Sequence, residues 1–200
     1  DSSQTIVNEL YATPGGGTLK HLFLDNVNQE LYYLESYNSS ANGTFVRKTS
    51  LNNFNPQTVY IIPNRVSDIA EFKVHPNTGE FYWSIDNAPQ HGLFHYSQGS
   101  VIQDATGYVY SIAFDSNGDL FYGGQHDLKD SQGTTIYTSN YTIEELEYDA
   151  GTNSFFMSGS DYISNSNAGV IWHSGGSSIQ DISLNQLTSE VLYVSGGVLG

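Results

Sequence analysis

The stretch Phe114–Gly124, FDSNGDLFYGG, decides how the whole chain is interpreted. Asp115, Asn117 and Asp119 alternate around a glycine, as oxygen ligands do at the start of a calcium loop. The apolar runs on both sides instead favour a β-hairpin, in which the Asn-Gly pair forms a two-residue turn and tolerates positive φ. We interpret the stretch as a hairpin, because the same pattern recurs along the chain.

Five stretches share this pattern, in which an alternating strand ends at a polar anchor residue and a polar turn follows. A second strand begins five or six residues after each anchor. The anchors are Asp25, His75, Asp115, Asp149 and Asn185. They lie 50, 40, 34 and 36 residues apart, a mean of 40, which is typical of four-stranded propeller blades. We expect the hairpins near residues 21–36, 71–86, 111–124, 145–159 and 181–196.

The remaining strands complete the predicted blades. After each of the first four hairpins we expect a third strand that opens on glycine, at Gly43, Gly92, Gly133 and Gly169, and then a fourth segment. The fifth copy has only two strands, and the segment 4–12 is a candidate strand that closes the ring. We therefore predict one all-β domain over residues 1–200, a five-bladed β-propeller of four-stranded antiparallel blades. The alternative is part of a six-bladed or larger propeller.

The second strands LYYLES, FYWSID, LFYGG and VLYVSG resemble the L-Y-W-T-D strand of lipoprotein-receptor propellers. The segment GTFVRKTSL resembles the I-x-R-x-x-L-D-G stretch of that family, with Phe45, Arg47 and Leu51 in matching places. The family aspartate falls on Ile85, and Asp86 follows one place later. The D-x-x-G-x-L-Y turn is also similar to propellers of the NHL and SMP-30/gluconolactonase types. The resemblance implies a propeller fold, and the SMP-30 likeness adds metal-dependent lactonase activity as an alternative function.

The charge of the chain excludes several partners. It has 21 acidic and 6 basic residues, and its formal net charge is -15. Nucleic acid and anionic membrane surfaces are therefore disfavoured, since both are bound by clusters of Lys and Arg. No apolar run reaches the roughly 20 residues that a membrane-spanning helix needs. Cationic partners and neutral ligands such as sugars stay open.

Three N-x-S/T triplets, at Asn38, Asn42 and Asn140, are candidate glycosylation sites. Together with the uncharged polar surface they favour a secreted, extracellular glycoprotein. The chain has no cysteine, and its first residue is Asp rather than Met, so we expect a processed or partial chain.

Four acidic residues are candidates for a site at the propeller axis. Asp68, Asp104 and Asp181 each precede the expected first strand of a blade, and Glu144 has a comparable place. Carboxylates that converge there repel one another unless a cation or hydrogen-bond donors separate them. The pattern predicts a cation or polar-ligand site, with calcium as the candidate ion. The alternative is that each carboxylate bonds to its own turn or to the neighbouring blade.

The sequence carries no nucleophile elbow, no HExxH metal motif and no nucleotide-binding glycine loop. We therefore predict a non-catalytic binding or assembly module. Its loop faces would bind a protein or glycan partner, or copies of the chain itself in oligomers or filaments. The aromatic residues, Trp83 and Trp172 among them, suit sugar stacking as well as packing between blades. The alternative is a metal-dependent hydrolase or lactonase with its site at the axis.

Overall fold

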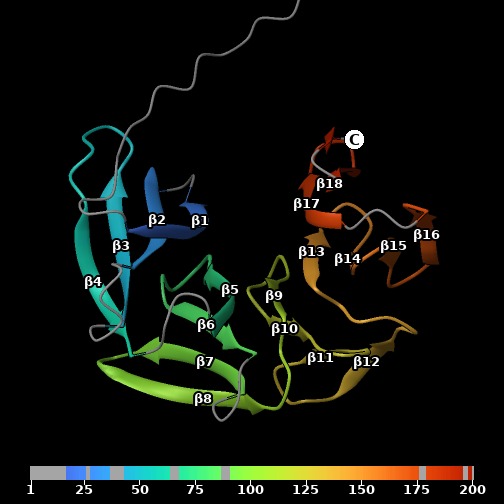
Figure 1. Cartoon of the computed structure of the whole chain (residues 1–200), viewed down its shortest axis with the longest axis horizontal. Coiled ribbons are helices and arrows are strands. Elements are labelled where there is room, and N and C mark those ends of the chain that lie inside the picture. Colours follow the sequence, from blue (N-terminus) through green and yellow to red (C-terminus); the bar gives the residue numbers. More distant parts are fainter. Residues whose placement is uncertain are drawn as a thin grey trace, which may run out of the picture. The chain divides into compact units, whose positions relative to one another are not determined.

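The computed structural model describes residues 17–25, 28–36, 43–63, 68–86, 91–175, 179–195 and 198–199. Every element within these ranges is a β-strand (Figure 1). The chain divides into two compact units, 1–67 and 68–200. The single domain predicted over 1–200 stays a prediction. The predicted closing strand at residues 4–12 lies outside the described residues.

The first unit contains one antiparallel meander. Its strands are β1 (Thr18–Asp25), β2 (Glu30–Ser36), β3 (Thr44–Ser50) and β4 (Gln57–Ile62), paired in that order. Arg47, which the family resemblance singled out, donates from Nε to Oε2 of the fully buried Glu35 at 2.7 Å. Because an isolated buried carboxylate is costly, this charge-assisted bond is what allows Glu35 to lie inside the sheet.

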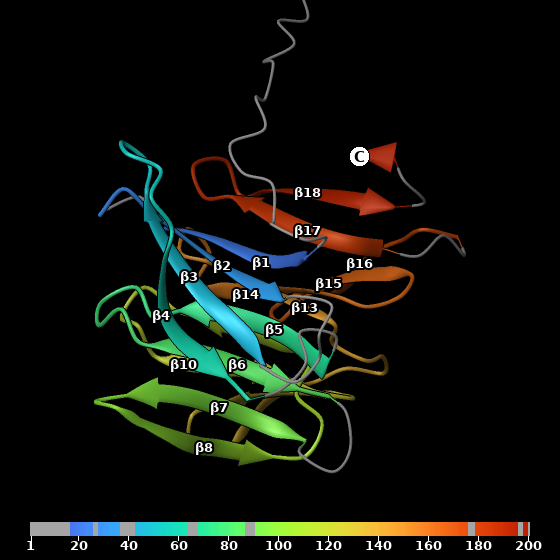
Figure 2. The same cartoon turned by 60° about the vertical axis from the view of Figure 1, so that its left-hand side comes forward.

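The second unit contains three further four-stranded meanders and one smaller sheet. The second sheet consists of β5 (Ile69–Val74), β6 (Phe81–Ile85), β7 (Gly92–Ser97) and β8 (Ser100–Thr106), and Figure 2 shows this meander. The third consists of β9 (Ser111–Phe114), β10 (Leu120–Gly123), β11 (Asp127–Asp130) and β12 (Thr135–Thr138). The fourth consists of β13 (Glu145–Asp149), β14 (Ser154–Ser158), β15 (Tyr162–Asn165) and β16 (Gly169–His173). The fifth consists of β17 (Ile179–Asn185), β18 (Glu190–Ser195) and β19 (Val198–Leu199).

The sheets of the second unit are arranged as propeller blades. Their first strands contact one another in turn, β5 with β9, β9 with β13, and β13 with β17. The buried apolar residues lie between consecutive sheets rather than within one. Tyr82 and Leu93 of the second sheet pack with Ile112 and Tyr122 of the third. The third and fourth sheets, and the fourth and fifth, share buried clusters in the same way.

Each of the five anchor side chains accepts hydrogen bonds from backbone N–H groups of its own turn. The Oδ1 of Asp115 accepts from the N–H of Asn117 at 2.9 Å and of Asp119 at 2.8 Å. Asp25, Asp149 and Asn185 accept from turn amides through Oδ1 in the same way. His75 does so through its Nδ1, which accepts from two successive amides. The hairpin interpretation is therefore confirmed at all five positions, since the anchors satisfy turn amides that no strand pairs. The predicted two-residue turn at Asn117 and Gly118 is wrong, because the N–H of Gly118 bonds to the carbonyl of Asp115 at 3.0 Å and only Gly118 of the pair has positive φ.

Some of these turns are also joined to the turn of the next sheet. The side chain of Asn77 donates to the carbonyl of Asn117 at 3.0 Å. Gln186 donates to the carbonyl of Tyr148 at 2.7 Å and accepts from the N–H of Ala150 at 3.3 Å. The turns thus hold neighbouring sheets in register as well as closing their own hairpins.

The prediction of five four-stranded blades is wrong. Four sheets have four strands, whereas the fifth has two full strands and the two-residue β19. The physical reason is that β19 pairs with β18 over two residues only, Val198 and Leu199, and no further strand pairs with β19 among the described residues. The glycine-opened strands are also placed differently in two sheets, because Gly133 and Gly169 come just before or at the start of the fourth strands β12 and β16. The third strands there, β11 (DLKD) and β15 (YISN), have four residues each, too few to show a clear apolar alternation.

Gly118→Ala should destabilise the protein more than Gly79→Ala. Both glycines have positive φ, +87° and +72°, so both variants incur the cost of a left-handed backbone, roughly 1–2 kcal/mol. An added Cβ at Gly118 would lie 2.7 Å from Asn77 Nδ2, whereas at Gly79 it meets nothing within 4 Å. Urea unfolding measures the difference in free energy. Equal losses of unfolding free energy in the two variants would show that the contact of Asn77 with the turn at Gly118 does not contribute to stability.

Candidate functional site

The four predicted acidic residues lie at different places in the fold. Asp68 directly precedes β5, and Glu144 directly precedes β13. Asp181 lies within the first strand β17, because that strand begins two residues earlier. Asp104 lies within β8, the outermost strand of the second sheet, where its Oδ2 is 2.7 Å from His95 Nδ1. The structure therefore brings Asp181 to the first strands, while Asp104 belongs to a sheet edge.

Asp181 belongs to a charged cluster on the first strands. Lys73 of β5 places its Nζ 3.2 Å from Oε1 of Glu147 on β13 and 4.0 Å from Oε2 of Glu71. Burial acts against the charge of Lys73, but the carboxylates of Glu71, Glu147 and Glu145 raise its pKa above the ordinary value. The ammonium of Lys73 thus supplies the positive charge that converging carboxylates require.

Burial is also what sets the protonation of the acids in this cluster. Burial, followed by the neighbouring Glu71, raises the pKa of Glu145 to about 8, while Lys73 opposes the shift. Burial likewise raises the pKa of Asp181, against the effect of Lys73. In the ranges that the structure describes, no group of three or more His, Cys, Asp or Glu has the geometry of a metal site. The cluster is a network of ion pairs around Lys73.

The sequence interpretation missed Glu71, Lys73 and Glu147. A signal for them was present, since Glu71 and Lys73 on β5, and Glu145 and Glu147 on β13, are two residues apart and so share a face of their strands. Asn38 and Asn42 lie outside the described residues, and Asn140 is exposed between β12 and β13.

A second feature is the face formed by the connections that enter the first strands and by those that leave the second strands, here called the loop face. It consists of residues 107–110, 124–126, 139–144 and 159–161. Backbone hydrogen bonds hold it together, such as those from Ile143 to Gly124 and from Glu144 to Ser158. Ile143 and Glu144 lie in the connection before β13. Ser158 ends β14 of the same sheet, and Gly124 follows β10 of the preceding sheet.

Aromatic rings gather on the loop face. Tyr108 is 47% exposed; its ring stacks on Tyr110 with centroids 6.0 Å apart and meets His91 edge-on at 4.4 Å. Tyr141 packs against Tyr162 at 4.5 Å and His173 at 5.7 Å. Burial raises the pKa of Glu144, which follows Tyr141 by three residues. Rigid rings with exposed edges are typical of binding surfaces.

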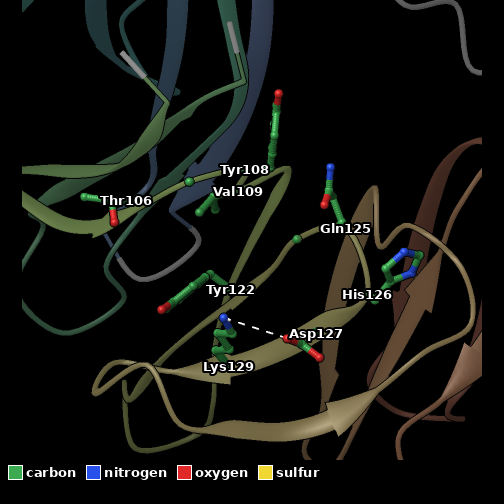
Figure 3. Close-up of a pocket in the computed structure, with 10 residues that line it drawn as sticks. Thr106, Tyr108, Val109, Tyr122, Gln125, His126, Asp127 and Lys129 are labelled. Carbon is green, nitrogen blue, oxygen red and sulfur yellow. Dashed lines mark ion pairs between the residues drawn. The ribbon is translucent and has the colours of Figure 1, made fainter. Parts of the chain in front are cut away.

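The third feature is a groove between the second and third sheets. Two hollows, of about 260 and about 450 Å³, share Thr106, Tyr122 and Lys129 in their walls. Figure 3 shows the first hollow, with the ion pair of Lys129 and Asp127 drawn at its side. Tyr122 and Lys129 are direct cross-strand partners on β10 and β11. The second hollow continues past Asp104 on β8, so the groove runs along the boundary of two blades.

No protein-family model and no curated protein matches the chain. Among solved structures it is similar to a chain in a crystal structure of a nidogen/laminin complex, with a TM-score of 0.67 and 13% identity over 88% of this chain and 72% of that one. It is also similar to the extracellular domain of BT4673 from B. thetaiotaomicron in two structures, with TM-scores of 0.60 and 0.61 and 14% identity. The match covers 90% of this chain but only 25% and 26% of those chains. At these identities the likeness shows the fold, a β-propeller.

No helix in the described part of the chain is long and apolar enough to cross a membrane.

Glu145→Gln should stabilise the protein at alkaline pH. The folded state raises the pKa of Glu145 to about 8, so its favourable contribution is present below the ordinary pKa and is lost as the pH rises through about 8. The glutamine stays neutral, so the gain in Tm over wild type should be larger near about pH 8.5 than near about pH 5. Glu190→Gln, on the exposed side of β18, controls for the loss of one charge. The same gain at both pH values would contradict the burial of this carboxyl.

Proposed function

We propose that the chain is a non-catalytic, extracellular binding module whose loop face binds a protein partner. The observation that carries the proposal is the pair of aromatic groups around the exposed Tyr108 and the half-buried Tyr141. Tyrosine is enriched at protein interfaces because its ring buries a large area with little loss of side-chain entropy, and its hydroxyl bonds at the rim. The similarity to a chain solved in a nidogen/laminin complex, and to an extracellular domain, supports the proposal.

The geometry of the loop face suits binding better than catalysis. Its rings are held in place by contacts with one another and with the backbone: Tyr141 packs on Tyr162, which donates its hydroxyl to the carbonyl of Thr142 at 2.7 Å. A preorganised surface loses little entropy when a partner docks. The carboxyl groups nearby, Glu144 and Asp161, favour a partner segment that carries Lys or Arg, whose charges also stack on tyrosine rings.

A random-peptide phage library tests this role directly. Peptides selected on the wild-type chain should bind Tyr141→Ala about tenfold more weakly, because the central ring of an interface is where truncation costs most. Tyr60→Ala, on the outer strand β4 of the first unit, is the matched control and should bind them as wild type does. If the selected peptides bind Tyr141→Ala as tightly as wild type, the loop face is not the surface that binds them.

Self-association is a second candidate, favoured by the outermost strands. The last strands of the four-stranded sheets, β4, β8, β12 and β16, are sheet edges, and each exposes β-branched aliphatic side chains. The exposed residues are Val59, Ile61, Val101, Ile102, Ile136, Val170 and Ile171. An apolar edge with unpaired backbone groups can add a strand from another chain. Candidate edges such as β4 carry no charged residue that would prevent this pairing.

Sedimentation velocity tests the edge pairing. The wild-type chain should form oligomers as its concentration rises, and Ile61→Lys combined with Val170→Lys should return it to monomers, because a charge on an edge strand opposes pairing. A wild-type chain that stays monomeric at millimolar concentration would refute self-association through these edges.

A further inference from the structure

We infer that the groove between the second and third sheets is a binding site for a neutral oligosaccharide. The inference goes beyond the proposed protein-binding role, because it concerns a ligand of another class, bound along the boundary of two blades where the groove adjoins the loop face at Tyr108. It starts from the two hollows, which are contiguous through Thr106, Tyr122 and Lys129. Because the hollows continue into one another, the groove has room for an extended ligand.

The charges in the groove disfavour ionic ligands. Lys129 is one of only six basic residues in the chain, and its Nζ lies 3.8 Å from Oδ2 of Asp127. Asp104 adds a second carboxyl to the wall of the same groove. An anionic ligand would meet two carboxylates and one ammonium in a chain whose net charge is -15. The described residues also offer no metal-ligand group there, so a neutral ligand fits best.

The polar groups in the groove match the hydroxyl groups of a sugar. Asp127 accepts and Lys129 donates, and both project from the same face of β11 because they are two residues apart. Two neighbouring hydroxyls of a sugar ring can donate to the carboxylate and accept from the ammonium at once. The hydroxyl of Tyr122 lies on the neighbouring strand, directly opposite Lys129. Gln132, in the second hollow, adds a carboxamide that can donate and accept.

The groove also has an apolar platform for a sugar ring. Tyr108 lines the first hollow, and its ring is 47% exposed and supported from behind by Tyr110. An aromatic face of this kind packs against the C–H face of a pyranose, while the polar groups bind its edge. Val109 lies between Tyr108 and Tyr122 in the close-up and gives the groove an apolar floor (Figure 3). An apolar floor with a few convergent polar groups is what a small-ligand site requires.

Calorimetric titration with defined hexasaccharides tests the inference. The probes are cellohexaose, maltohexaose, laminarihexaose, xylohexaose and chitohexaose, with hexagalacturonate as the anionic comparison. At least one neutral probe should bind, and hexagalacturonate should not. Lys129→Met and Asp127→Asn should each weaken binding of that probe about tenfold, because each removes a hydrogen bond from a charged group. Lys20→Met, on the exposed face of β1, is the matched control and should bind as wild type does.

The outcomes also separate this site from the loop face. Tyr141→Ala should keep sugar binding while it loses peptide binding. Lys129→Met should lose sugar binding while it keeps peptide binding. Circular dichroism and Tm show that each variant is folded before it is titrated. The inference is overturned if no neutral hexasaccharide binds the folded wild-type chain at millimolar concentration, or if Lys129→Met binds the sugar as tightly as wild type.

Discussion

The hydrogen bond from a turn amide to an anchor side chain is the interaction on which the rest of the structure depends. It recurs at all five hairpins, with Asp, Asn or His as the acceptor. Each bond ends a first strand at a fixed residue and so fixes the register of the second strand, whose apolar side chains must face the neighbouring sheet. A shift of one residue would turn Tyr82 or Tyr122 away from the cluster that joins the second and third sheets.

The same constraint places the candidate sites. Fixed hairpins set where each first strand ends and each second strand begins, and the connections at the other ends of these strands form the loop face. The register of β10 and β11 puts Tyr122 opposite Lys129, which creates the wall of the groove. The ion network around Lys73 lies on the first strands themselves, where alternating side chains meet across neighbouring sheets. The fold thus separates the charged cluster around Lys73 from the loop face and the groove, the two surfaces that we propose bind ligands.

Local features of the fold could be predicted from the sequence, because a turn and its anchor are only a few residues apart. Asp115 and His75 were recognised in this way, and the strand at residues 145–149 was predicted as well. The blade count failed because the sequence pattern marks hairpins and not the length of the strands that follow them. In the fifth sheet the hairpin of β17 and β18 is followed by β19, which pairs over two residues only.

The candidate sites were predictable only in part. Asp181 was singled out as an acid near a first strand, but its neighbours Glu71 and Lys73 lie more than a hundred residues away along the chain. Asp104 was expected in a connection, whereas β8 extends to Thr106 and carries Asp104 at a sheet edge. The groove was not foreseen, since its walls come from different sheets and depend on how those sheets pack.

Amide hydrogen exchange followed by NMR is the most direct test of the anchored hairpins. The amides of Asn77, Asn117, Asp119, Gly151 and Leu187 lie in turns, where exposed N–H groups normally exchange at the rate of an unfolded chain. If the anchor side chains accept these hydrogen bonds, all five amides should be protected, and Asp115→Ala should remove the protection of Asn117 and Asp119 alone. Exchange of all five amides at unfolded-chain rates in the wild-type protein would contradict the account.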